Sequence, residues 1–173
     1  TYIKPKNKIS FFLDFNKEQA KINMNFGYND TMKAFKKLDG DYFTFKKKEI
    51  SKFYQKNKEE LSHYLNTNLT EKKLLKLIED LGKEFSLRED TIYSLNNYFE
   101  KLRIGVNSSS KLTTEIKKEI KSKNISVTKN AKLITLYFLS NIENNKKENK
   151  ALSLFFAKQY MEALFLSFIG AHY

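Results

Sequence analysis

The sequence contains no cysteine and no tryptophan, one proline and five glycines. The absence of cysteine excludes disulfide bonds, thiolate catalysis and every zinc or iron–sulfur site built on cysteine ligands. It also permits a reducing compartment, and we expect a cytoplasmic location. Five dispersed glycines leave no glycine-rich loop for binding phosphate. We therefore expect no cofactor.

Arginine is almost as scarce, because Arg88 and Arg103 are the only arginines among 32 basic residues. With 20 acidic residues, the formal net charge is +12. Lysine is a point charge without the planar fork of arginine, so a lysine-rich surface favours attraction to a phosphate backbone over readout of base edges. AT-rich codon usage also produces a lysine-rich composition, so composition alone does not establish a polyanionic partner.

The basic residues are unevenly distributed along the chain. Residues 1–60 carry 14 basic and 8 acidic residues, and residues 107–150 carry 10 and 4. The intervening segment 61–106 is balanced at 7 each, and 151–173 has one of each. Two basic regions thus flank a neutral middle, which indicates a surface with a preferred side.

The 173 residues, 40% of them hydrophobic, predict one globular domain spanning 1–173. Within it we expect a subregion with a β-hairpin at 1–46, a helical subregion at 47–105, a hinge at 106–110 and a helical subregion at 111–173. We see no secretory signal. The apolar stretch at 150–173 carries charges that would lie near the centre of a bilayer, so we expect no membrane span.

The fold class that these patterns predict is α+β and predominantly helical. Apolar residues alternate around 9–15 and 22–26, which predicts an antiparallel hairpin, and Tyr42–Phe45 could add a third strand. About six helices should pack on this hairpin. We expect the longer ones around 47–65, 71–81, 86–105, 112–124, 129–142 and 150–173, with the last one buried, and a short one at 31–38. A buried strand at 133–139 competes with the helix at 129–142.

Two lysine-rich surfaces, around 4–58 and 111–132, are the candidate binding regions. In the second, a basic helix, a turn and another helix between Leu112 and Phe138 are typical of a helix-turn-helix, although plain helix packing accounts for the pattern as well. The candidate contact residues are Lys8, Lys21, Lys46, Lys47, Lys48, Lys117, Lys118, Lys121, Lys123, Lys129, Asn130 and Lys132.

Catalytic chemistry has little support in the sequence. The two histidines, His63 and His172, lie far apart along the chain, and we expect no metal site. The acids around Asp39, Asp41 and Glu49 lack the acid and lysine element of a metal-dependent nuclease. We predict no enzyme, with a metal-free nuclease that uses lysine, tyrosine and His63 as the alternative.

Three functions follow from these patterns. The first is non-enzymatic binding of nucleic acid, or of a nucleoprotein complex, through lysines that contact the phosphate backbone. The second is a protein–protein interaction module, such as a small mobile-element or virus-encoded inhibitor or an assembly subunit. Its C-terminal helix would then serve as a homodimer or partner interface. The third is a ribonuclease-like toxin, which predicts growth arrest that His63→Ala relieves.

Overall fold

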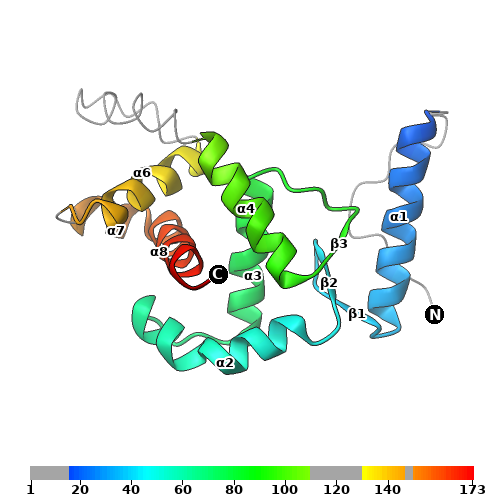
Figure 1. Cartoon of the computed structure of the whole chain (residues 1–173), viewed down its shortest axis with the longest axis horizontal. Coiled ribbons are helices and arrows are strands. Elements are labelled where there is room, and N and C mark those ends of the chain that lie inside the picture. Colours follow the sequence, from blue (N-terminus) through cyan, green and yellow to red (C-terminus); the bar gives the residue numbers. More distant parts are fainter. Residues whose placement is uncertain (1–15, 110–129, 147–149) are drawn as a thin grey trace.

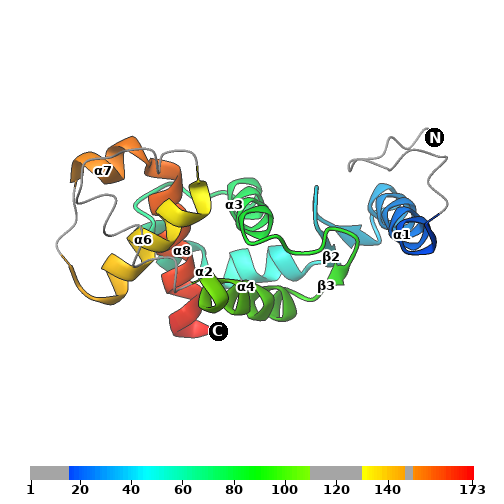
Figure 2. The same ribbon diagram turned by 90° about the horizontal axis from the view of Figure 1, so that it is seen from above.

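The computed structural model describes residues 16–109, 130–146 and 150–173. Its elements are α1 (Lys17–Ala34), β1 (Leu38–Asp39), β2 (Thr44–Lys46), α2 (Glu49–Tyr64), α3 (Glu71–Glu84), β3 (Ile92–Tyr93), α4 (Leu95–Ser109), α6 (Ala131–Glu143), α7 (Lys150–Phe155) and α8 (Ala157–His172). The predicted fold class, α+β and predominantly helical, is confirmed. Helix α1 lies at one end of the molecule and α6, α7 and α8 at the other (Figure 1), and the view from above keeps this order (Figure 2).

The predicted strand at 22–26 is wrong, because these residues lie in α1. Asn16 caps that helix, and its side chain accepts hydrogen bonds from the backbone N–H groups of Glu18 and Gln19. Ile22 and Phe26 are half-buried, whereas Met24 is 74% exposed. Ile22 and Phe26, four residues apart, share one helix face, whereas Met24 lies on the opposite face, so the same three residues occur in a helix without forming one apolar side. The partner strand predicted at 9–15 lies outside the described residues.

The structure contains a β-hairpin, but β1 and β2 form it, at the place of the predicted third strand. β1 and β2 pair antiparallel, with Leu38 opposite Lys46, and β3 adds to β2 in parallel, with Phe45 opposite Tyr93. The predicted strand at Tyr42–Phe45 is thus confirmed for its second half. The helix predicted from Ser86 begins only at Leu95, because the chain first pairs with β2 at Ile92 and Tyr93.

The helix predicted at 71–81 extends to Glu84 as α3, so Gly82 lies within it and does not end it. An added Cβ would lie 1.9 Å from the hydroxyl oxygen of Tyr98 and 2.7 Å from the ring of Phe43. Phe43 and Tyr98 are both fully buried, with ring centroids 5.3 Å apart. The glycine therefore permits close contact of α3 with the aromatic core rather than a turn.

The segment 106–110, which the sequence predicts as a hinge, is helical through Ser109, because α4 continues past Gly105. Gly105 faces the ring of Phe85, which lies 3.3 Å from the position of an added Cβ. A glycine thus permits close packing here without ending the helix. The helix predicted at 129–142 is confirmed as α6, which begins at Ala131 after the cap Asn130, and the competing strand is wrong. The helix predicted at 112–124 lies outside the described residues.

The buried C-terminal helix is confirmed, although it breaks at Phe156 into α7 and α8. Phe165 of α8 is fully buried and contacts the rings of Phe53 and Phe99, with centroids 6.4 and 6.0 Å apart. Helix α8 also packs along α6 (Figure 2). Phe155, at the end of α7, is instead 78% exposed. None of the helices in the described ranges has both the length and the apolar character needed to cross a bilayer.

Candidate nucleic-acid interface

Five lysines gather at one end of the β1–β2 ribbon. Lys36 and Lys37 precede β1, and Lys46, Lys47 and Lys48 end β2 and begin the turn into α2. Because Leu38 pairs with Lys46, both junctions lie at the same end of the ribbon (Figure 1). All five side chains are exposed. We call Lys36, Lys37, Lys46, Lys47 and Lys48 the ribbon-end lysine cluster.

Asp39 ties the two junctions together. Its carboxylate accepts a hydrogen bond from the ammonium group of Lys47 and, at 2.6 Å, one from the backbone N–H of Lys48. The ion pair offsets the charge of Lys47, so the five lysines and Asp39 together carry a net excess of four positive charges. Such an excess of positive charge on one small surface attracts polyanions.

The backbone at two of these lysines adopts a left-handed conformation. Lys36 has a φ of 56° and Lys48 a φ of 65°. Lys36 follows the C-terminus of α1 and Lys48 precedes α2, two positions where glycine or asparagine is the less strained choice. A lysine at such a position costs conformational free energy, so the fold itself does not account for these lysines.

An aromatic ring adjoins the cluster. Phe35 follows α1 directly, is 65% exposed and immediately precedes Lys36. An exposed ring beside lysines is the arrangement with which proteins stack a base while the cations contact the backbone. Phe35, Lys36 and Lys37 extend the candidate contact residues that the sequence predicts.

A buried carboxylate fixes the loop between β1 and β2. Glu79 of α3 is 3% exposed, and its Oε1 accepts hydrogen bonds from the backbone N–H groups of Asp41, Tyr42 and Phe43 at 2.7, 2.9 and 3.1 Å. Burial raises the pKa of Glu79, and these three bonds oppose the rise. The ribbon is therefore anchored to the helical core from its loop, which leaves its lysine end free to face solvent.

The other predicted contact residues are dispersed. Lys21 is exposed on α1. Asn130 caps α6, with its side chain accepting from the N–H of Leu133, and Lys132 is half-buried with its ammonium group 5.1 Å from the centre of the Phe85 ring. Helix α6 lies at the opposite end of the molecule from the ribbon (Figure 1). The remaining predicted residues lie outside the described ranges: Lys8, Lys117, Lys118, Lys121, Lys123 and Lys129.

Lys36 and Lys37 were missed because the sequence predicts a helix through 31–38, whereas α1 ends at Ala34. The signal that could have found them is the turn at Asp39, Gly40 and Asp41, with a lysine run on each side. Gly40 has a φ of 107°, which only glycine adopts readily. A hairpin centred on Gly40 would have brought the two lysine runs together.

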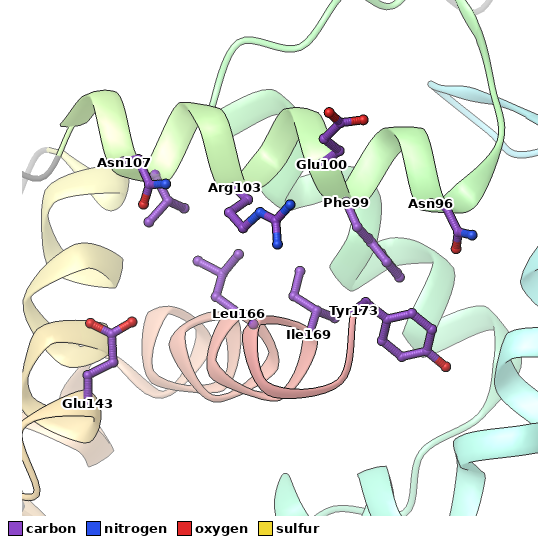
Figure 3. A pocket seen from close by; sticks show the side chains of 11 residues that line it. Asn96, Phe99, Glu100, Arg103, Asn107, Glu143, Leu166, Ile169 and Tyr173 are labelled. Carbon is purple, nitrogen blue, oxygen red and sulfur yellow. The ribbon is translucent and has the colours of Figure 1, made fainter.

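A cavity of about 240 Å³ lies between α4, α6 and α8 (Figure 3). Its charged side chains are those of Arg103, Glu100 and Glu143, around an apolar wall that includes Leu166 and Ile169. Figure 3 shows Arg103 directed toward that wall and Glu143 approaching from α6. Two carboxylates against one guanidinium make this cavity unsuited to a phosphate, so it does not belong to the candidate interface.

A second polar cluster is buried between α3, α6 and α8. The Thr135 hydroxyl oxygen lies 3.1 Å from Glu84 Oε2 and 3.3 Å from Glu162 Oε2. Burial, and then repulsion from Glu84, raise the pKa of Glu162 to about 8. The two carboxyl groups therefore share a proton at neutral pH. Lys158 completes the cluster, 3.4 Å from Glu162 and 3.0 Å from Asp80.

No group of three or more histidine, cysteine, aspartate or glutamate side chains within the described ranges is arranged to hold a metal ion. His172 stacks on Phe168 and lies 3.3 Å from Glu60. His63 is exposed in the last turn of α2. The alternative of a metal-free nuclease that uses lysine, tyrosine and His63 stays a prediction.

Comparison of the chain with models of protein families, with curated proteins and with solved structures gives no match.

Proposed function

We propose that this protein binds nucleic acid, free or within a nucleoprotein complex, through the ribbon-end lysine cluster. The observation that carries the proposal is the register of β1 and β2, which brings Lys36 and Lys37 together with the three lysines at 46–48. The left-handed backbone at Lys36 and Lys48 supports it, because a purely structural role would favour glycine at both positions.

The chemistry of the cluster favours a single strand. Lysines contact phosphates as point charges and give little sequence preference. Phe35 offers a ring face to an unpaired base, whereas the bases of a duplex are already stacked. Nothing in this mechanism requires bond breaking, so the proposed activity is binding without catalysis.

The direct test is fluorescence anisotropy with labelled oligo-dT, oligo-U and duplex DNA across a salt series. Single strands should bind more tightly than the duplex, and affinity should fall steeply with salt because each phosphate that binds a lysine releases a counterion. Affinity that does not change between low and moderate salt would contradict the proposal.

Replacement of Phe35 separates stacking from charge. Phe35→Ala should weaken binding of the single strand by about 1 to 3 kcal/mol without changing the salt dependence, as expected for loss of one stacked base. Phe155→Ala is the matched control, because it removes another exposed phenylalanine, 78% exposed against 65% for Phe35, from α7. If both variants bind alike, Phe35 does not stack on a base.

A further inference from the structure

A groove between α3 and the start of α8 has an apolar floor and a basic rim. The space measures about 530 Å³. Leu69, Leu77 and Met161 supply the apolar lining, and Lys73, Lys76 and Lys158 supply the charge. We infer that this groove binds an acidic amphipathic helix of a partner protein. The inference is independent of the nucleic-acid proposal, because none of these residues belongs to the ribbon-end lysine cluster.

The lining of the groove indicates the chemistry of its occupant. Leu69 and Leu77, 1% and 7% exposed, form the base of the groove, and half-buried Met161 is its more accessible apolar residue. Such a lining accepts aliphatic side chains, and methionine adapts readily to different partners. Bases stack instead on aromatic rings or guanidinium planes, and none is among the residues that line this groove. A protein segment therefore suits the floor better than a nucleic acid.

The charges at the rim favour an acidic segment. Lys76 is exposed on α3, and the side chain of Lys158 remains 55% exposed although it pairs with Asp80. Three lysines against the one aspartate leave the rim positive. A second copy of this chain, with a net charge of +12, would be repelled from such a rim, which makes a homodimer through this groove unfavourable.

Two exposed apolar residues precede α8 in the sequence. Leu154 and Phe155 are 79% and 78% exposed and precede Lys158 by four and three residues. Exposed apolar side chains of this size are typical of protein interaction sites. The C-terminal part of the chain thus combines a buried core helix with exposed apolar side chains.

The test uses a fluorescein-labelled synthetic peptide with leucines at helical positions i, i+3, i+4 and i+7 and glutamates at the remaining positions. A scrambled peptide of the same composition is the control for charge. Anisotropy should report binding of the amphipathic peptide and binding of the scrambled peptide that is at least about tenfold weaker. Equal binding of the two peptides, or no binding of the amphipathic one, would overturn the inference.

The Met161→Lys variant separates the groove from general attraction to a basic protein. It adds a positive charge but places it on the apolar floor, so peptide affinity should fall by about tenfold or more. A general electrostatic attraction would instead raise the affinity, and that result would contradict the groove.

Lys76→Glu, at an exposed position, should weaken binding of the amphipathic peptide more than binding of the scrambled one, and this difference is decisive if Met161→Lys does not fold; an equal loss for both peptides would contradict the groove. The double variant Lys36→Gly, Lys48→Gly should bind the peptide like the wild type. Displacement of the peptide by oligo-dT, with loss of oligo-dT binding in Met161→Lys, would assign the groove to nucleic acid and overturn a protein partner.

Discussion

The sheet end and the helical end of this molecule each bury an acidic side chain, but they compensate its charge differently. Glu79, beneath the sheet, receives three backbone N–H groups from the β1–β2 loop. Glu162, between α3, α6 and α8, faces a second carboxyl group, a threonine hydroxyl and one ammonium group. Three peptide N–H groups partly compensate the charge of Glu79, whereas Glu162 depends on a proton and on Lys158.

This difference shows how each end uses its lysines. At the sheet end the fold does not need lysine to compensate Glu79, so the ribbon-end lysines remain exposed to solvent. At the helical end Lys158 forms ion pairs with Asp80 and Glu162, so its charge compensates a buried carboxyl group while its side chain remains partly exposed. The first arrangement suits binding of an external anion, and the second couples stability to pH.

The largest effect should come from closing the space at Gly82. Gly82→Ala places a methyl group 1.9 Å from the Tyr98 hydroxyl, so the free energy of unfolding should fall by roughly 3 kcal/mol or more. Chemical denaturation measures this loss. Tyr98→Phe removes the oxygen, and the double variant should lose less than the sum of the single losses. Additive losses would mean that the hydroxyl contact does not dominate.

The next effect tests the anchor of the ribbon. Glu79→Ala leaves three backbone N–H groups without their acceptor and should lower the free energy of unfolding by about 2 to 3 kcal/mol. Glu79→Gln keeps an oxygen acceptor and should lose less. If alanine and glutamine cost the same, the three hydrogen bonds do not stabilise the fold as described.

At the helical end, stability should depend on pH through Glu162. The pKa of this carboxyl is raised from 4.5 to about 8, so the folded state holds a proton that the unfolded state releases. Its stabilising contribution is complete below pH 4.5 and is lost as pH rises through about 8. The thermal midpoint should decline over that window in the wild type and decline less in Glu162→Gln. Parallel profiles would contradict the shared proton.

The smallest effect concerns the backbone of the ribbon-end lysine cluster. Lys36→Gly relieves a left-handed lysine and should raise the free energy of unfolding by up to about 1 kcal/mol. Lys37→Gly removes the same charge from a residue without a positive φ and should not stabilise. A loss of stability in Lys36→Gly would show that its side chain serves the fold.

The sequence predicts elements well where apolar spacing is long, as in α2, α3 and α6. It fails where few residues decide between structures. Ile22 and Phe26 fit either a strand or a helix, and the cap Asn16 favours the helix. Ile92 has helical spacing with Leu95, yet pairing of Ile92 and Tyr93 with β2 prevails. The burial of Glu162 depends on tertiary contacts with Glu84 and Thr135 that lie far away in the sequence.

The candidate site, too, could be predicted from the sequence only in part. Lys46, Lys47 and Lys48 follow from the lysine run and the predicted strand. Phe35 and Lys36 require the C-terminus of α1 to be placed correctly, and the register with β2 cannot be read from composition. The groove between α3 and α8 depends on how two distant helices pack, which local patterns do not determine.

The most direct test of the central proposal is the salt dependence of oligo-dT binding by the double variant Lys36→Gly, Lys48→Gly. The matched control is Lys146→Gln, Lys150→Gln, which removes the same charge at the end of the molecule that holds α6 and α7 (Figure 1). Loss of two phosphate contacts should reduce the slope of log affinity against log salt by about 1.4 in the glycine variant. The control should keep the wild-type slope. Equal slopes in the two variants would contradict a binding site at the ribbon-end lysine cluster.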